Sequence, residues 1–435
     1  MNRLLIRNAR IAKPDGEIAA GDVLCENGVI ANIGPQRAQA DTTIDAKGLL
    51  LLPGVIDPHV HFREPGKEYK EDLASGSRAA ARGGVTSFLE MPNTEPATTT
   101  RALLQDKLAR AAQKCVVNYG FFIGATPDNV AELNAADAAC GIKIFMGCST
   151  GNLLVHKDED LERIFAVGDS LIAVHAEDEA RIHARKGQFA GRTDAAAHSE
   201  IRDAECAHIA VARALGFARK YNRRLHILHA STVAEMDLLR REKTPRVRVE
   251  VIPNHLFLNI DDYARQGGRV QMNPPIRTAA DNAALWQALH DGVIDFIGTD
   301  HAPHTLKEKD LPFPQTPSGM PGVETSLALM YTALTEGRLD LAQLQRWMCS
   351  GPAEAYGIAR KGKILEGWDA DLVLIDTETA QPVRNDALFT KAKWSPYAGR
   401  SLRGWPQYTI VNGEVVYARG VIHEHVRGRA LEFQA

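Results

Sequence analysis

Two histidines that lie one residue apart are the first candidates for chemistry. His59 and His61 fall in the segment 57–66, directly after the apolar run 49–56. Alternate side chains of a β-strand leave the same face, so this spacing would offer both imidazoles to one metal ion. Arg63, two residues farther on, would place a permanent cation beside that ion. An H-x-H pair alone is weak evidence, and its weight depends on what the rest of the chain supplies.

Length and composition restrict the class of protein. The chain has 435 residues, 45% of them hydrophobic and 24% charged, with a formal net charge of −3. These values predict a globular protein of two or three domains and give no sign of a surface that binds nucleic acid or a membrane. The N-terminal segment lacks the apolar core and cleavage site of a signal peptide. Six cysteines are scattered without C-x-x-C spacing, so we expect a reduced, cytoplasmic protein.

Both ends of the chain have the sequence pattern of short β-strands joined by turns. Residues 1–52 show short alternating apolar runs around the turn signals Asp15-Gly16 and Asn27-Gly28, and residues 362–435 repeat the pattern around Asn412-Gly413. We predict one small β-sandwich assembled from both termini. The alternative is a pair of unrelated terminal extensions.

The middle, residues 53–361, alternates strand-like and helical patterns. This pattern predicts an α/β fold of the (β/α)₈ TIM-barrel type. A doubly wound sheet is less favoured because no G-x-G-x-x-G turn occurs. Eight apolar runs form the expected strands: 51–62, 85–91, 116–123, 141–146, 171–176, 225–229, 247–258 and 293–299.

Polar side chains recur where these strands should end. In a barrel the chemistry sits at the C-terminal edge of the strands, where an unpaired polar group costs free energy unless it is hydrogen-bonded or bound to metal. A single histidine there is usually a hydrogen-bonded core residue, but a repeated pattern is hard to reach by accident. The candidates in chain order are His59, His61, Asn93, Lys143, His175, His229, Asn273, Asp300, His301 and His304.

The set of imidazoles and a carboxylate suits Zn²⁺. We predict that His59, His61 and Asp300 bind one zinc ion and that His175 and His229 bind a second. A lysine ammonium has no lone pair for a metal, but a carbamate formed on Lys143 could bridge two cations together with a hydroxide. Asp300 is the predicted general base and acid.

The remaining histidines and one cysteine are assigned smaller roles. We expect His226 and His255 to lie behind the ligands, and Cys148 is a weak candidate for a ligand or nucleophile. Five histidines in polar or helix-like contexts are expected to be exposed: His156, His183, His198, His208 and His290.

Longer motifs carry a family resemblance over essentially the whole chain. The segments 53–61 and 81–86 resemble the amidohydrolase superfamily. The segments His61-Phe62-Arg63-Glu64-Pro65-Gly66, Met91-Pro92-Asn93-Thr94, Asn273-Pro274-Pro275-Ile276-Arg277 and Thr299-Asp300-His301-Ala302-Pro303-His304-Thr305 are similar to its dihydroorotase branch, of the longer bacterial class.

This resemblance implies a reaction and a substrate site. Dihydroorotases hydrolyse dihydroorotate, a cyclic ureide with a carboxylate, reversibly to N-carbamoyl-L-aspartate in pyrimidine biosynthesis. The resemblance assigns Arg63, Asn93 and His304 to the substrate carboxylate, His61 to substrate as well as metal, and Asn273, Ser318 and Gly319 to the ureide ring. It also implies a homodimer that acts on a small molecule.

One departure concerns the bridging ligand. Some members of the bacterial class use an aspartate there, whereas Lys143-Ile144-Phe145-Met146-Gly147 resembles the branch with a carbamylated lysine. Two other functions remain open. A hydantoinase or allantoinase would keep the metal site but would have less use for Arg63, and a non-catalytic scaffold would have lost its metals.

Overall fold

Eight parallel strands form a closed barrel in the computed structural model, which describes residues 2–35, 38–148 and 153–434. One parallel sheet has the order β6-β7-β8, and a second has the order β14-β13-β12-β11-β10-β9. β8 and β9 are separated only by Phe122 and together count as one strand of the barrel. A parallel bridge between Val60 and His301 closes the ring. The barrel strands are β6 (Val55–Val60), β7 (Val85–Glu90), β8 (Asn118–Phe121), β9 (Ile123–Gly124), β10 (Ile142–Phe145), β11 (Ile172–His175), β12 (Leu225–Ile227), β13 (Val247–Val251) and β14 (Phe296–Ile297).

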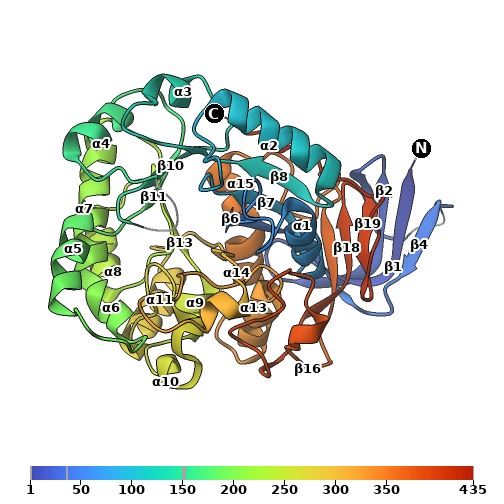
Figure 1. Ribbon diagram of the computed structural model, residues 1–435. Helices are drawn as coiled ribbons and strands as arrows, with labels where there is room; N and C mark the ends of the chain where they lie inside the picture. Colours follow the sequence, from blue (N-terminus) through green and yellow to red (C-terminus); the bar gives the residue numbers. More distant parts are fainter. Residues whose placement is uncertain (1, 36–37, 149–152, 435) are drawn as a thin grey trace.

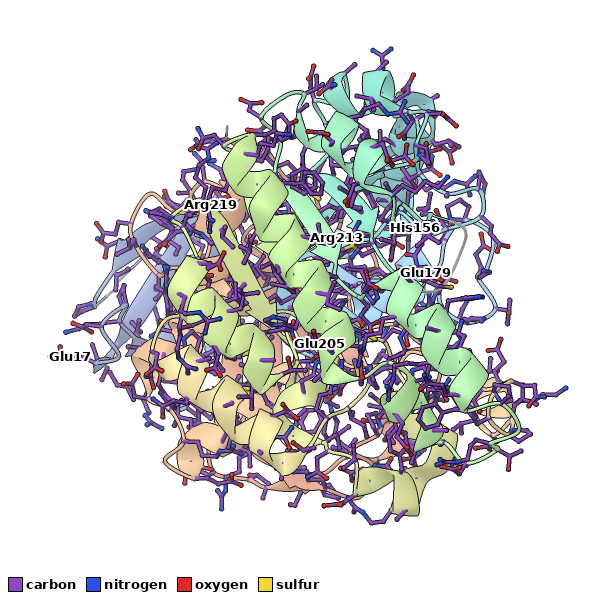
Figure 2. The ribbon with its side chains drawn as sticks, turned by 90° about the vertical axis from the view of Figure 1, so that its left-hand side faces the viewer. Glu17, His156, Glu179, Glu205, Arg213 and Arg219 are labelled. Carbon is purple, nitrogen blue, oxygen red and sulfur yellow. The ribbon has the colours of Figure 1, made fainter. Side chains whose placement is uncertain are left out.

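Helices cover the outside of the barrel (Figure 1). α7 shows why the sequence folds this way: Asp203 caps its N-terminus, and its small apolar residues are buried along one face. Figure 2 shows Arg213 and Arg219 on this helix, with His156 and Glu179 beside it. These outer helices are α1 (Leu73–Arg82), α2 (Arg101–Lys114), α3 (Val130–Asn134), α4 (Asp158–Phe165), α5 (Glu179–Gln188), α7 (Ala204–Lys220), α8 (Val233–Glu242), α11 (Ala279–His290), α13 (Ser326–Thr335), α14 (Leu341–Gln345), a π-helical turn η2 (Arg346–Ser350) and α15 (Gly351–Tyr356).

Shorter helical segments lie in the connecting loops: α6 (Ala197–Ile201), α9 (Pro253–Phe257), α10 (Asp262–Gln266), η1 (Gly267–Val270), α12 (Leu306–Lys309) and η3 (Asn385–Ala387). One of them corrects a predicted boundary. The expected strand 247–258 ends at Val251, and α9 begins at Pro253. Proline has no backbone N–H for a sheet but fits the first turn of a helix, which explains the switch.

Strands from both chain ends join in one nine-stranded sheet beside the barrel, at the right of Figure 1. β5 pairs in parallel with β1 and antiparallel with β15, so the two ends meet at its edges. Apolar side chains of both ends, such as Ile6, Val23 and Leu372, share a core of their own. The strands are β1 (Arg3–Ala12), β2 (Ile18–Glu26), β3 (Val29–Ile33), β4 (Thr42–Asp45), β5 (Leu50–Pro53), β15 (Leu372–Asp376), β18 (Trp405–Val411), β19 (Glu414–Ala418) and β20 (Val421–Ile422), and a separate pair is formed by β16 (Gln381–Pro382) and β17 (Ser401–Leu402).

Within the described part of the chain, no helix has the length and apolar character needed to cross a membrane.

Candidate active site

The predicted metal ligands gather at the C-terminal edge of the barrel. His59 lies in β6, His175 ends β11, and His229 and Asp300 follow the ends of β12 and β14. His59, His61, Lys143, His175, His229 and Asp300 are each 7% exposed or less. His229, Asp300 and Arg63 have left-handed backbone angles, with φ of 37°, 46° and 66°. Such conformations are costly for these residue types and cluster at functional sites.

Asp300 joins the two histidines of the H-x-H segment. Its Oδ1 lies 3.2 Å from Nε2 of His59 and 3.0 Å from Nε2 of His61. Burial opposes ionisation of Asp300, but the charge and hydrogen bond of His59, together with His61, hold its pKa well below the usual range. Asp300 is therefore an ionised carboxylate aimed at two imidazole nitrogens.

The second pair of histidines is equally close. Nδ1 of His175 lies 3.0 Å from Nε2 of His229, and the rings of His59 and His229 have centroids 5.2 Å apart. Ligand atoms of His59, His229 and Asp300 all lie within 4.8 Å of one another. The structure therefore links both predicted pairs in one cluster rather than separating them.

The spacing fits metal ligands. Two donor atoms bound to one zinc at about 2.1 Å in tetrahedral geometry lie about 3.4 Å apart, close to the N···O and N···N separations of 3.0–3.2 Å seen here. Burial lowers the pKa of His61 to about 4 and the pKa of His229 well below its usual value. A neutral imidazole is the form that binds metal. The donor set therefore fits one or more divalent cations.

Buried carboxylates orient the histidines from behind. Nδ1 of His59 lies 2.8 Å from Oε1 of Glu250, and Nε2 of His175 lies 3.0 Å from Oε2 of Glu177. Each bond places the opposite ring nitrogen toward the cluster, as carboxylate–histidine–metal arrangements require. Burial lowers the pKa of His59, but Glu250 and Asp300 outweigh this effect and raise it to about 9, so metal binding at His59 must displace a proton. Arg202 in turn pairs with Glu177 at 2.6 Å.

Sequence reasoning missed Glu250, Glu177 and Asp57. A charged residue inside the apolar segment Val249-Glu250-Val251 was the available signal for Glu250. Asp57 ties β6 to the strand end near Asp300, because it accepts hydrogen bonds from Thr299 N at 3.1 Å and Thr299 Oγ at 2.6 Å. Burial raises the pKa of Asp57 to about 7. A Cβ at Gly298 would lie 2.6 Å from Oε2 of Glu250, so a side chain there would disturb this support.

Lys143 is buried in β10 without an acidic partner. Its Nζ lies 4.5 Å from the ring centroid of Phe145, and no hydrogen bond or ion pair to it occurs among residues 2–35, 38–148 and 153–434. Burial lowers the pKa of Lys143 to about 7, against the opposing charges of Asp300 and Glu250. Burial therefore favours the neutral amine of Lys143.

Arg63 and His304 form a second, cationic part of the site. The guanidinium is 3% exposed, its Nε donates to Pro303 O at 3.2 Å, and Nη2 lies 3.3 Å from Nε2 of His304. Among the described residues no carboxylate lies within ion-pair distance of Arg63. Glu64, a conceivable partner, pairs with Lys114 and Arg110 instead.

Asn93 contacts one of the predicted metal ligands. Its Oδ1 lies 2.7 Å from Nδ1 of His61, so the amide orients that imidazole. Whether it also contacts a substrate carboxylate, as the resemblance implies, stays a prediction.

Two of the three residues expected at the ureide ring line one cavity. Asn273 and Ser318 line the same cavity of about 540 Å³. Gly319 has φ of 137°, and a Cβ there would lie 2.4 Å from Ala302 O, so this turn needs glycine. His198 was expected to be exposed, and that prediction was wrong. It is 8% exposed, and its Nε2 lies 2.8 Å from Oδ1 of Asn273.

The other histidines behave as packing and positioning groups. His226 is fully buried with Nδ1 2.5 Å from Tyr356 Oη, and Nε2 of His255 lies 3.2 Å from Pro274 O and Pro275 O. His301 is also buried, and its Nδ1 accepts from Gly322 N at 3.0 Å. Cys148 is partly exposed at the rim of the same cavity as Asn273, and its backbone N–H donates to Glu179.

Comparisons with known proteins agree with this geometry. The model of the Amidohydrolase family matches residues 50–416. A dihydroorotase of Methanosarcina acetivorans is 38% identical, over 98% of this chain and 95% of its own, and a dihydroorotase of Bacillus subtilis is 35% identical over 96% and 98%. Among solved structures, the L-hydantoinase (dihydropyrimidinase) of Arthrobacter aurescens has a TM-score of 0.94 at 32% identity, over 99% of this chain and 100% of its own. The chain therefore belongs to the amidohydrolase family, and within it is a cyclic amide hydrolase related to the dihydroorotases.

Proposed function

We propose that the protein is a dihydroorotase, which hydrolyses dihydroorotate reversibly to N-carbamoyl-aspartate. One observation carries this choice of substrate: Arg63 is a buried guanidinium without a carboxylate partner among the described residues. A buried charge without a partner is costly, so a site that retains one is suited to an anionic ligand. The planar guanidinium can donate two parallel hydrogen bonds to a carboxylate. Dihydroorotate carries such a carboxylate, whereas a hydantoin ring does not.

Asp300 is the group that can move the proton. Its pKa lies well below the usual range, so it is ionised and able to accept a proton from the attacking water. It can then return that proton to the ring nitrogen as the amide bond breaks. His59 and His61 hold its Oδ1 at 3.2 and 3.0 Å, which fixes the orientation of the carboxylate.

The same residues are suited to hold two zinc ions. Bound there, the cations would polarise the ring carbonyl and lower the pKa of water toward neutrality. His59, His61 and Asp300 would serve one ion, and His175 and His229 the other, with Glu250 and Glu177 keeping the first imidazole of each group in place.

Lys143 is the proposed bridge between them. A neutral amine attacks CO₂, forms an N–C bond and releases one proton to give a carbamate. The lowered pKa of Lys143 supplies the neutral amine. We expect Lys143→Ala to abolish turnover, and millimolar acetate or propionate to restore part of it, because a small carboxylate can replace the two carbamate oxygens. Full activity of the variant without any added acid would refute this role.

A hydantoinase is the second candidate, because the solved structures of hydantoinases share this fold closely. An absorbance assay with zinc-loaded protein decides between them, with dihydroorotate, hydantoin and allantoin tested in parallel. Turnover of dihydroorotate alone supports the proposal. Turnover of hydantoin or allantoin alone would retain the metal chemistry and overturn the substrate assignment.

A further inference from the structure

A buried imidazole and a buried carboxylate face each other behind the metal cluster. His226 lies in β12 and Glu250 lies in β13, and neither side chain is exposed to solvent. Nε2 of His226 lies 3.5 Å from Oε2 of Glu250. Among the described residues, neither of these two atoms makes a hydrogen bond with any other group. A buried polar atom without a partner is costly, so each of the two atoms needs the other.

The second polar atom of each side chain is already in use. Nδ1 of His226 lies 2.5 Å from the Tyr356 hydroxyl. Oε1 of Glu250 lies 2.8 Å from Nδ1 of His59 and accepts from the backbone N–H of His229 at 3.1 Å. Glu250 therefore contacts one predicted metal ligand at its side chain and another at its backbone, and Oε2 is the oxygen left for His226.

The position of the proton on His226 follows from these contacts. Burial raises the pKa of Tyr356 well above its usual value, so the hydroxyl keeps its proton and can donate it. Burial lowers the pKa of His226 well below its usual value, so the ring is neutral and has one N–H. With that proton on Nε2, Nδ1 accepts from Tyr356 and an N–H faces the Glu250 carboxylate. With the proton on Nδ1, two acceptors would face each other in the core, which is costly.

We infer that His226 is a positioning residue for the metal site, because its Nε2–H holds the Glu250 carboxylate that orients His59. The inference rests on the proposed function, since it concerns the zinc site of that proposal. With one oxygen at His59 and the other at His226, the carboxylate is restrained from both ends. A Cβ at Gly298 would lie 2.6 Å from Oε2, so the backbone leaves little space there for another donor.

A merely structural role for His226 has a different signature. It would lower stability with any smaller side chain, and zinc binding would not depend on where the remaining N–H lies. The amide of glutamine takes the place of Nε2 and can still donate to Glu250, whereas the amide of asparagine takes the place of Nδ1 and reaches only Tyr356. Tyr356→Phe is the matched control, because it removes a buried hydrogen bond from the same imidazole and leaves the Nε2–H beside Glu250.

The experiment measures the zinc Kd of each variant by competition with a chelator, together with the melting temperature of the metal-free protein. His226→Asn should raise the Kd of zinc by about 10-fold, the lower end of the cost of losing an outer partner of a metal ligand. His226→Gln should stay within about 3-fold of the wild type, because it retains the donor to a charged group. Tyr356→Phe should melt at a lower temperature with an unchanged zinc Kd.

A second measurement keeps the inference testable if a variant at position 226 does not fold. NMR of protein whose histidines carry a heavy nitrogen isotope reports which ring nitrogen of a buried imidazole bears the proton. The signal of His226 is identified by its shift in Tyr356→Phe. We expect the proton on Nε2.

Four results would overturn the inference: an unchanged zinc Kd in His226→Asn, an equal loss in His226→Gln, an equal loss in Tyr356→Phe, or a proton on Nδ1 of His226. Wild-type protein that binds no zinc would refute the metal site and this role together. The zinc titration does not require turnover. Wild-type protein that binds zinc without hydrolysing dihydroorotate would therefore refute the proposed substrate and leave the role of His226 to be decided by the variants.

Discussion

Replacement of Arg63 by methionine tests whether this arginine binds the substrate or stabilises the fold. The guanidinium is buried, its Nε donates to Pro303 O at 3.2 Å, and it has no ion pair among the described residues. Methionine fills a similar volume without the charge. If Arg63 serves the substrate carboxylate, activity should fall while the fold is retained.

The expected magnitude follows from these contacts. Two hydrogen bonds to a carboxylate, each worth about 1.5–3 kcal/mol, give a loss of about 3–6 kcal/mol, or about 10²- to 10⁴-fold in kcat/KM. Breaking a buried ion pair usually costs about 3–5 kcal/mol of stability, but Arg63 has no such pair to break. Removing an unpaired buried charge relieves desolvation, so the free energy of unfolding should fall by less than about 1 kcal/mol or should rise.

Lys361→Met is the matched control with the opposite expectation. Lys361 is 8% exposed and pairs with Asp371 and, at 3.1 Å, with Asp369. Asp371 belongs to the segment that leads into β15, in the nine-stranded sheet. Lys361→Met should therefore lower the free energy of unfolding by about 3 kcal/mol and leave kcat/KM unchanged.

The assay is steady-state hydrolysis of dihydroorotate by zinc-loaded protein, combined with chemical denaturation of each variant. Near-normal kcat/KM in Arg63→Met would refute the carboxylate assignment and favour a hydantoinase. A loss of stability in Arg63→Met as large as in Lys361→Met would show that the guanidinium is part of the structural framework.

Three further predictions test the metal site and Glu324, a buried carboxylate outside the site that accepts hydrogen bonds from Phe389 N and Thr390 N. Glu250→Gln should weaken zinc binding by about 10- to 100-fold, because Glu250 orients His59. The metal content of the variant after dialysis against a series of chelators measures its zinc affinity, and an unchanged affinity would contradict this role of Glu250. Removal of the metal from the wild type should lower its melting temperature. A ligand present at about 1,000 times its Kd adds about 4 kcal/mol to the free energy of unfolding. Identical melting curves of the metal-loaded and metal-free protein would argue against the site. Burial raises the pKa of Glu324 from 4.5 to about 7, so the folded state binds more protons than the unfolded state between these values and stability falls as pH rises through them. Glu324→Gln should therefore gain about 2 kcal/mol relative to the wild type between pH 5.5 and pH 8 in denaturation experiments, and a constant difference would contradict the raised pKa.

The sequence by itself predicted the barrel and the gathering of several candidate ligands at one edge of it, because both depend on local periodicity. A buried parallel strand is a short apolar run, and its last residue marks the edge where chemistry sits. His59, His175, His229 and Asp300 could therefore be placed at one edge before any contact was known. The failed boundary at Val251 has the same basis: an apolar run does not distinguish a strand from a short buried helix such as α9.

Only the tertiary structure decided which groups support these residues. Glu250 meets His59 across 191 positions of the chain, and Lys70 meets His304 across 234. His198 looked like a surface residue on a polar segment, yet the fold buries it against Asn273. Neither local secondary-structure propensity nor hydrophobic periodicity reports such pairs, because closure of the barrel brings distant loops to one edge. Burial at that edge then shifts the pKa values of the side chains. The chemistry of the ligands was therefore local in the sequence, and their positioning was a property of the closed barrel.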